Sequence, residues 1–436
     1  MDKILSDLNK KIKNKQLGIA VVGLGYVGFP LALEFAKKKV KVTGIEIDAD
    51  RLKSIAGRKS YISDISSQEL TAVMASGYFK ASSSFADIAQ ADAVLICVPT
   101  PLKGKYLPDI SFIRKAVSQI ALHLKNGALV ILESTTYPGT TEEEILPIFQ
   151  KRGFRHGEDF FLCFSPERID PGNKKFPVHK IPKVIGGLSP KATQLAMAVY
   201  RIIIKQVVPV SSCRAAETVK LLENTFRLIN IGLIDELSMM AHQMKIDIWE
   251  VIGAASTKPF GFMPFYPGPG VGGHCIPKDP LYLHWKAKSF GFHSRFIKLA
   301  SQVINYMPEY IVKRIREALL RRGSKLEGAK ILVLGVTYKK NIKDLRKSPS
   351  IDVIKSLKRQ GAKISYADPL IPFLKLEGLD LESVALTAKK IKEFDACIIA
   401  TDHAKVNYTA LLKNAKFIFD SRNVFKGKHT PKVERL

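Results

Sequence analysis

The sequence predicts an α/β protein with two Rossmann-like, doubly wound parallel-sheet domains joined by a long central helix. Apolar strand-like runs alternate with helical patterns as far as about Val210, and the same alternation resumes at Lys325. Between these regions, residues 215–247 keep a helical pattern without a proline. Strands that alternate with helices are typical of a mostly parallel sheet.

The individual elements follow from the apolar runs. In the first region we expect a strand at 18–22, a helix at 29–38 and a strand at 41–47. Further strand-like runs lie at residues 92–99, 127–135, 159–166, 182–187 and 205–210, with helical patterns at 111–124 and 140–153. The second region has strand-like runs at 328–336, 362–369, 395–402 and 415–423 and a helical pattern at 350–361.

The length and composition fit a multidomain globular enzyme. The chain has 436 residues, of which 46% are hydrophobic and 25% charged, so two or three domains are expected. We predict a dinucleotide-binding domain at 1–210, a helical domain at 211–320 and a second sheet domain at 321–436. No apolar run approaches the ~18 residues that cross a bilayer, and the basic N-terminus lacks the core of a secretory signal. A cytoplasmic enzyme is the expectation.

Charge and cysteine content exclude several classes of protein. The net charge of +28 raises the question of nucleic acid, but the lysines are dispersed and no aromatic-basic module accompanies them. A polyanionic small ligand such as a dinucleotide suits a basic protein equally well. The five cysteines lack both disulfide and metal-ligand spacing, so no metal site is expected. Cys97, Cys163 and Cys397 lie in apolar runs and are interpreted as buried structural thiols.

The glycine-rich turn between the strand at 18–22 and the helix at 29–38 matches a dinucleotide-binding motif. Residues 23–28 read GLGYVG, directly after a predicted strand and before a predicted helix. Gly23 would make the tight turn, Gly25 would let a pyrophosphate approach the backbone, and Gly28 would let helix and strand pack closely. Tyr26 and Val27 complete the segment, whose helix N-terminus would bind the pyrophosphate.

The residue at the end of the second strand predicts which dinucleotide binds. Glu46 is placed to accept a hydrogen bond from a ribose 2′-OH, and an acid there disfavours a 2′-phosphate, so NAD is expected rather than NADP. Asp48 and Arg51 lie nearby. Arg51 could stack on the adenine, or it could be a solvated surface cation.

A shaped loop surrounds one further cysteine. Residues 267–280 read PGPGVGGHCIPKDP, in which four glycines and four prolines constrain the backbone around Cys275. A dehydrogenase that passes through an aldehyde can trap it on a thiol, oxidise the adduct to a thioester and hydrolyse that to an acid. Only a few per cent of an ordinary thiol is ionised at neutral pH, and a cation such as Lys220 or Lys278 would raise that fraction. The glycines would let a substrate approach the sulfur.

These motifs, together with AETVKLLENTF, SPERIDPG, CVPTP and ESTTYPGTT, resemble the UDP-glucose/GDP-mannose dehydrogenase family over nearly the whole chain. The segment STKPFGFMPFYPGPG is most similar to the branch that oxidises UDP-N-acetylhexosamines, chiefly UDP-N-acetylglucosamine, at C6. The resemblance implies that Cys275 is the covalent nucleophile in an NAD-dependent four-electron oxidation of CH2OH to carboxylate, within a route to surface polysaccharide or glycan precursors. It departs at His274, because UDP-glucose enzymes commonly show GYGGYCLPKD there. His274 could polarise the thiol or merely pack.

The resemblance also implies the other site residues. Lys220 would stabilise alkoxide charge, with Asn224 on the same helix face, although a salt bridge of Lys220 with Glu217 or Glu223 is the plainer alternative. Asp279 would position water, and Glu167 and Thr135 would act in thioester hydrolysis. The implied cofactor residues are Gly23, Gly25, Tyr26, Val27, Gly28, Glu46, Arg51, Thr100, Thr135 and Arg346. The implied substrate residues are Glu167, Arg168, Lys220, Asn224, Tyr266, Gly268, Gly272, Tyr338, Lys339 and Arg422.

The apolar character of the central helix predicts that it is buried, between domains and against the partner subunit of a homodimer. Two other functions remain as alternatives. A two-electron hydroxyacid dehydrogenase would need neither the cysteine loop nor the second sheet, and a non-catalytic nucleotide-binding protein would not need the intact set of Cys275, Lys220, Asn224 and Asp279. UDP-N-acetylmannosamine and UDP-glucose are the alternative substrates.

Overall fold

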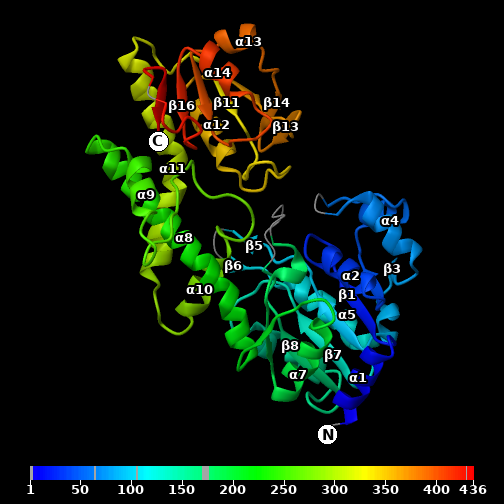
Figure 1. The fold of residues 1–436 in the computed structure, drawn as a ribbon. Helices are drawn as coiled ribbons and strands as arrows, with labels where there is room; N and C mark the ends of the chain where they lie inside the picture. The colour runs from blue at the N-terminus through cyan, green and yellow to red at the C-terminus, as the bar shows by residue number, and fades with distance from the viewer. Residues whose placement is uncertain (1–2, 63–64, 105–106, 169–175, 429) are drawn as a thin grey trace. The chain divides into compact units, whose positions relative to one another are not determined.

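The computed structural model describes residues 3–62, 65–104, 107–168, 176–428 and 430–436 (Figure 1). The chain divides into two compact units. Unit 1 comprises Met1–Glu223 and Leu281–Phe292, and unit 2 comprises Asn224–Pro280 and His293–Leu436. The three predicted domains are a finer division, which stays a prediction. Within the described residues, no helix combines the length and the hydropathy that crossing a membrane requires.

Unit 1 is built on an eight-stranded sheet with the order β10-β9-β8-β7-β4-β1-β2-β3. The strands are β1 (Gly18–Val22), β2 (Lys41–Ile45), β3 (Phe79–Ser82), β4 (Ala93–Ile96), β7 (Ala128–Leu132), β8 (Phe160–Phe164), β9 (Lys183–Gly187) and β10 (Val207–Pro209). Every neighbouring pair is parallel except β8 and β9. The predicted parallel sheet is confirmed. Its strand order reverses between β1 and β4, the position where open sheets of this kind bind ligands.

The antiparallel strand β9 was not predicted as such. A parallel return would need a crossover of about a dozen residues, usually a helix. The described residues between β8 and β9, which are 165–168 and 176–182, hold only the short 3-10 helix η3 (Val178–Lys180). The chain therefore returns beside β8 in the opposite direction.

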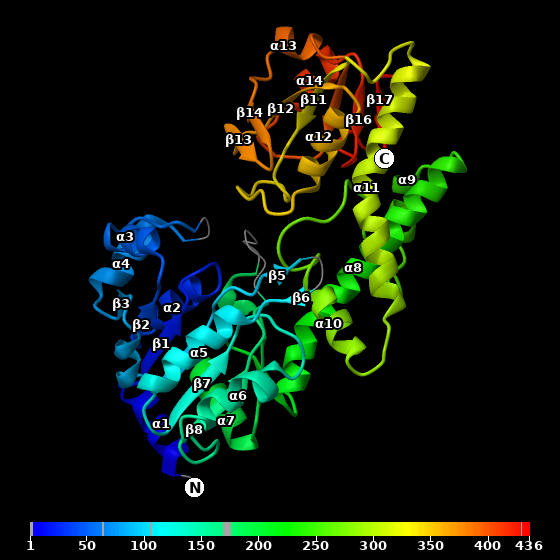
Figure 2. The ribbon, with the colours of Figure 1, turned by 180° about the vertical axis from the view of Figure 1, so that it is seen from behind.

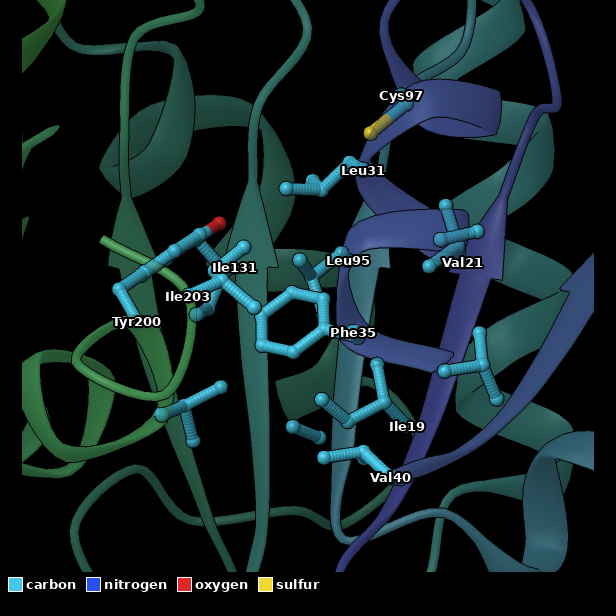
Figure 3. Close-up of a cluster of buried hydrophobic side chains, with 14 of the residues drawn as sticks. Ile19, Val21, Leu31, Phe35, Val40, Leu95, Cys97, Ile131, Tyr200 and Ile203 are labelled. Atoms are coloured by element: carbon cyan, nitrogen blue, oxygen red, sulfur yellow. The ribbon is translucent and has the colours of Figure 1, made fainter. Parts of the chain in front are cut away.

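Helices cover both faces of this sheet. Neighbouring residues of a strand point to opposite faces, so Val21 and Val22 belong to different buried clusters. Figure 3 shows the first cluster, in which α2 (Gly28–Lys37) and α7 (Pro190–Tyr200) pack on the strands. The opposite face is covered by α5 (Ser111–His123) and α6 (Leu146–Gln150). A sheet buried on both faces explains the continuous apolar runs of the sequence.

The smaller elements of unit 1 complete this arrangement. They are α1 (Lys3–Lys13), α3 (Ala49–Ala56), α4 (Ser67–Ala75), η1 (Phe85–Gln90), η2 (Thr141–Ile145) and the pair β5 (Leu102–Lys103) and β6 (Leu107–Pro108).

The predicted long helix is α8 (Cys213–Gln243), with 31 residues, and it contributes to both units. Leu221 and Leu228 are buried, but Phe226, Leu233 and Met240 are 45%, 52% and 51% exposed in the single chain. One chain by itself therefore leaves part of α8 exposed, and the predicted burial of this helix against a partner subunit stays a prediction. These three exposed residues recur every seven positions, which places them on one helix face.

Unit 2 contains the second predicted sheet (Figure 2). Five parallel strands have the order β12-β11-β15-β16-β17. They are β11 (Lys330–Leu334), β12 (Lys363–Ala367), β15 (Ala396–Ile399), β16 (Ile418–Asp420) and β17 (Val433–Arg435). The hairpin β13 (Phe373–Leu376) and β14 (Leu379–Glu382), and the strand β17, were not predicted. The helices are α9 (Ile248–Ala255), α10 (Asp279–Lys288), which begins in this unit, α11 (Arg295–Arg321), α12 (Pro349–Arg359), α13 (Ala388–Lys392) and α14 (Tyr408–Asn414).

Candidate active site

The glycine turn lies between β1 and α2, as its motif predicts. Gly23 has a φ of +92° and donates its N–H to the Ile45 carbonyl oxygen at 2.8 Å. A Cβ on Gly28 would lie 2.0 Å from the Gly23 carbonyl oxygen, so no side chain fits there. A Cβ on Gly25 would meet nothing nearer than Arg51 Nη1 at 4.0 Å. The turn therefore fits the close approach of the NAD pyrophosphate to the start of α2.

Glu46 follows β2 and is only 4% exposed. Its Oε2 accepts hydrogen bonds from Leu24 N at 3.0 Å and Arg51 Nη1 at 3.1 Å. Its Oε1 accepts from the backbone N–H groups of Ile47 and Asp48 at 2.9 and 3.1 Å. A carboxylate has about four lone-pair positions, so a ribose hydroxyl would have to share or replace one of these contacts. Glu46 thus also fixes the glycine turn to the end of β2, which sequence reasoning missed.

The other predicted cofactor residues have different surroundings. The guanidinium of Arg51 lies 5.8 Å from the centre of the Tyr61 ring, besides its ion pair with Glu46. Tyr26 is 43% exposed, and Val27 directly precedes α2. Thr100 is buried and its carbonyl oxygen accepts a hydrogen bond from Tyr282 Oη at 2.6 Å. Arg346 belongs to unit 2, where it binds Asp344.

Three predicted catalytic residues meet in unit 1. Lys220 Nζ, on α8, donates to Thr135 Oγ1 at 2.8 Å and to Glu167 Oε2 at 2.9 Å. Lys220 is 6% exposed and Glu167 is 8% exposed. Thr135 follows β7 and Glu167 follows β8, and the carboxyl ends of neighbouring parallel strands lie at the same edge of a sheet. A buried cation is thereby held beside an acid and a hydroxyl.

The alternative partners of Lys220 are engaged with other groups. Glu217 accepts hydrogen bonds from the backbone N–H groups of Gly139 at 2.6 Å and Thr141 at 2.9 Å. Burial raises the pKa of Glu217 to about 7. Glu223 forms an ion pair with Arg168 at 2.6 Å. Residues 169–172, the last four of SPERIDPG, lie outside the described residues.

Two more predicted catalytic residues meet in unit 2. Asn224 Nδ2 donates to Asp279 Oδ2 at 2.8 Å, and both side chains are buried. Cys275 is half-buried, and its carbonyl oxygen accepts from the N–H groups of Lys278 and Asp279 at 3.1 and 2.8 Å. The cysteine therefore stands one turn before α10.

The glycines before Cys275 lie against protein neighbours that leave no room for a side chain, and the expectation that they let a substrate approach the sulfur stays a prediction. A Cβ on Gly272 would lie 2.5 Å from Tyr338 Cβ and 2.6 Å from the Lys347 carbonyl oxygen. Gly273 has a φ of +81°, and a Cβ there would lie 2.8 Å from the Tyr338 ring. Its N–H donates to the Arg346 carbonyl oxygen at 2.9 Å. The loop is thus packed tightly on the segment that follows β11.

That segment is itself held by a buried histidine, His403, that sequence reasoning missed. His403 Nδ1 accepts the N–H of Asn341 at 3.0 Å, and Nε2 lies 3.1 Å from Asp368 Oδ2. His403 and Asp368 stand at the carboxyl ends of β15 and β12, and between them they fix the turn that carries Tyr338 and Lys339. A histidine directly after the strand-like run at 395–402 was the available signal.

The remaining predicted substrate residues lie around the start of the cysteine loop. Tyr266 is 56% exposed and its ring stacks on Trp249 at 6.0 Å between ring centres. Gly268 lies against Arg422, because a Cβ on Gly268 would be 2.7 Å from Arg422 Nη1. Arg422 Nε donates to the Ala400 carbonyl oxygen at 2.8 Å, and burial lowers the pKa of Arg422.

Asp235 of α8 is a further buried acid in this region. It is fully buried, and its Oδ1 accepts the N–H of Gly268 at 3.1 Å. Burial raises the pKa of Asp235 to about 8, which the Gly268 hydrogen bond and the Arg422 cation oppose. An Asp-Glu pair within an otherwise apolar helical run was the sequence signal for this residue.

We expect Asp235→Asn to be more stable than the wild type at high pH. Because the pKa of Asp235 is raised in the folded state, its protonated form stabilises the fold below about pH 4, and this contribution is lost as the pH rises to about 8. Asparagine keeps an acceptor for the Gly268 N–H and never ionises. Thermal unfolding should therefore show an advantage on the order of 5 kcal/mol at pH 9 that shrinks toward pH 4.

Asp235→Ala is the matched control, because it removes both the charge and the acceptor and should be less stable than Asp235→Asn at every pH. Unfolding curves of the wild type and Asp235→Asn that stay parallel between pH 4 and pH 9 would contradict the raised pKa.

The chain is similar to known proteins along most of its length. Residues 17–204 match the NAD binding domain of the UDP-glucose/GDP-mannose dehydrogenase family, residues 214–306 its central domain, and residues 332–427 its UDP binding domain. A UDP-N-acetyl-D-glucosamine 6-dehydrogenase of Pseudomonas aeruginosa is 39% identical over 359 residues, which cover 82% of this chain and 84% of that protein.

A second relative is similarly close. A UDP-N-acetyl-D-mannosamine dehydrogenase of Pyrococcus horikoshii is 36% identical over 415 residues, covering 94% of this chain and 96% of that protein. A solved structure of the UDP-D-ManNAc dehydrogenase from Pyrococcus horikoshii has a TM-score of 0.87 at 34% identity, covering 96% of this chain and 99% of that one. The chain therefore belongs to the UDP-glucose/GDP-mannose dehydrogenase family, and it is an NAD-dependent UDP-sugar dehydrogenase.

Proposed function

We propose that this protein oxidises the C6 hydroxymethyl group of a UDP-N-acetylhexosamine, with UDP-N-acetylglucosamine as the preferred substrate, to the carboxylate through a thioester on Cys275. The observation that carries this proposal is the half-buried thiol one turn before α10, four residues ahead of the buried pair of Asp279 and Asn224. A two-electron dehydrogenase has no use for such a thiol. The product would serve as a precursor of a surface polysaccharide or glycan.

The proposed reaction has four steps. The first oxidation removes a hydride and a proton from the alcohol and leaves an aldehyde. The sulfur of Cys275 then adds to the carbonyl carbon, forming a C–S bond and a thiohemiacetal. Loss of a second hydride and a proton gives the thioester. Water adds to its carbonyl carbon, the C–S bond breaks, and the thiolate and the carboxylate separate. Two molecules of NAD, one for each oxidation, would accept one hydride each.

We assign the side chains from their surroundings. Lys220 is a buried cation that would stabilise negative charge on the C6 oxygen at each stage, an effect that is strong where water is excluded. Glu167 and Thr135 both form hydrogen bonds with Lys220. Glu167 would take a proton from the hydrolytic water, and Thr135 would orient that water. Asp279, oriented by Asn224, would position water or substrate hydroxyl near the thiol.

The binding residues follow in the same way. We assign the glycine turn, Glu46 and Arg51 to the dinucleotide. Tyr338, Lys339 and Arg422 are assigned to the UDP-sugar, because they follow the strands of the second sheet, which matches a UDP binding domain.

The choice of sugar rests on the relatives. UDP-N-acetylglucosamine is supported by the Pseudomonas aeruginosa relative, a UDP-N-acetyl-D-glucosamine 6-dehydrogenase that is 39% identical. UDP-N-acetylmannosamine is the second candidate, favoured by the Pyrococcus horikoshii enzyme, which covers more of the chain and has a TM-score of 0.87.

The deciding experiment measures NADH formed per sugar nucleotide consumed. UDP-N-acetylglucosamine, UDP-N-acetylmannosamine, UDP-N-acetylgalactosamine and UDP-glucose are compared by kcat/KM. We expect two NADH per sugar and the highest kcat/KM with UDP-N-acetylglucosamine. A higher value with the mannosamine epimer would replace the substrate assignment, and one NADH with a stable aldehyde would overturn the four-electron route.

We also propose that the protein is a homodimer that pairs through α8. Its three apolar side chains at seven-residue spacing, Phe226, Leu233 and Met240, are about half exposed in one chain. Exposed apolar faces of this kind are typical of protein interfaces. Light scattering should give twice the 48.4 kDa of one chain, and a monomer mass would overturn this proposal.

A further inference from the structure

A second buried polar cluster lies in unit 1, at the ends of β7 and β8. Lys183 Nζ lies 2.5 Å from Glu133 Oε2, and the side chains are 12% and 1% exposed. Tyr200 is fully buried and donates its hydroxyl to Glu133 Oε1. The ammonium of Lys183 also lies 5.0 Å from the centre of the Tyr200 ring. No step of the proposed reaction uses these three residues.

The surroundings of the cluster are apolar. Tyr200 packs against Phe35, with 6.1 Å between ring centres. Figure 3 shows its hydroxyl directed toward the end of the hydrophobic cluster where Leu31 and Cys97 lie. An ion pair buried in such a place gains little or no stability over apolar side chains of the same size, because both ions lose their hydration. The cluster therefore calls for a reason other than stability.

Its position in the chain supplies that reason. Glu133 directly follows β7 and stands two residues before Thr135. Lys183 Nζ also lies 3.4 Å from the Pro166 carbonyl oxygen, which directly precedes Glu167. One ammonium group thus joins the ends of β7 and β8, and those two ends carry the two groups that bind Lys220.

We propose that Lys183, oriented by Glu133 and Tyr200, is a positioning residue that holds Glu167 and Thr135 in register for hydrolysis of the thioester. This inference rests on the proposed function. It concerns the last step, the attack of water on the acyl carbon, and not the binding of the sugar nucleotide.

A small cavity beside Glu167 gives a reason why this strand end needs a positioning residue. The cavity has a volume of about 20 Å³, and its lining includes the polar side chains of Glu133, Glu167, Arg168, Lys183 and Tyr200. A cavity of this size accommodates about one water molecule. Glu167 therefore has space beside it, and the contact of Lys183 with the Pro166 carbonyl limits the movement of that strand end. Misplacement of a catalytic group by about 1 Å can cost on the order of a hundredfold in rate.

The test uses the full-length chain with Lys183→Met. We expect kcat to fall about 30-fold with KM for UDP-sugar within about threefold of the wild type. We also expect a rapid burst of two NADH per subunit, followed by slow turnover, and an acyl adduct on Cys275 in the mass of acid-quenched enzyme. A merely structural role would not produce a burst with a trapped adduct.

Three further variants complete the experiment. Glu133→Gln combined with Lys183→Met removes both charges, so it avoids a lone buried carboxylate, and it should show the same burst and adduct. Lys183→Arg keeps a cation and should restore at least a third of wild-type kcat. Lys205→Met, an exposed lysine of the same sheet region, should leave kcat unchanged.

The outcomes separate the two proposals. Two NADH per sugar in the wild type, with wild-type steady-state turnover and no adduct in the double variant, would overturn the positioning role and leave the proposed function intact. The positioning role would also be overturned if the double variant had a higher KM and lost its burst rate and its steady-state rate equally. A wild type that forms no NADH with any UDP-sugar would overturn both.

Discussion

Cys275→Ala is expected to lower the steady-state formation of uronic acid by a thousandfold or more, because removal of a covalent nucleophile costs about that much in other enzymes. Without the sulfur no thioester forms, so the second oxidation has no route and NADH falls from two to at most one per sugar. Product analysis by mass spectrometry should find aldehyde or unreacted substrate in place of carboxylate. The thermal midpoint should change little, because the side chain is only half-buried.

Cys275→Ser is the matched variant, since it keeps the size and replaces only the sulfur. A hydroxyl is far less nucleophilic than a thiolate, so Cys275→Ser should share the defect. Retention of two NADH per sugar in either variant would eliminate the thioester and favour oxidation of a hydrated aldehyde.

Gly28→Ala is expected to destabilise unit 1 by about 3 kcal/mol and to abolish NAD binding. The new Cβ would lie 2.0 Å from the Gly23 carbonyl oxygen and 2.9 Å from Cys97 Cβ, and a backbone oxygen cannot move aside without opening the turn. Chemical denaturation followed by tryptophan fluorescence, together with calorimetric titration of NAD, would measure both effects.

Gly25→Ala is the control that separates the fold from the ligand. Nothing in the protein lies nearer than Arg51 Nη1 at 4.0 Å, so the variant should fold with wild-type stability. Its Cβ would instead occupy the space assigned to the pyrophosphate, and the Kd for NAD should rise about tenfold or more, a loss of about 1.4 kcal/mol. Equal losses of stability in the two variants, or unchanged NAD binding by Gly25→Ala, would contradict this assignment of the turn.

Much of the fold could be predicted from the sequence because both sheets are buried on both faces. The expected strand at 18–22 is confirmed as β1, and the next strand ends at Ile45 rather than at residue 47, where the carboxylate of Glu46 already bonds the following backbone. The thiols of Cys97, Cys163 and Cys397 are buried, as their apolar runs indicate. The hairpin β13–β14 was missed because its strands, FLKL and LDLE, are short and carry charged side chains on an exposed face.

The contacts within the site could not be predicted from local pattern. The sequence offers Lys220 three acidic partners, which are Glu167, Glu217 and Glu223. Only the three-dimensional structure shows that Lys220 binds Glu167, which is 53 residues away in the chain. The orientation of β9, which places Lys183 beside Glu133, depends on strand pairing rather than on the composition of β9. Resemblance to the family supplied the identities of Thr135 and Glu167, while their shared contact with Lys220 required the structure.

The unequal burial of the five cysteines has a practical consequence. Burial raises the pKa of the Cys97, Cys163, Cys213 and Cys397 thiols, whereas Cys275 is half-buried, one turn before α10. Alkylating reagents react with thiolates and need access to the sulfur. The native protein therefore presents one chemoselective handle, at which an electrophilic probe or a covalent inhibitor would label a single residue, and the rate of labelling would report on occupancy of the loop by ligands.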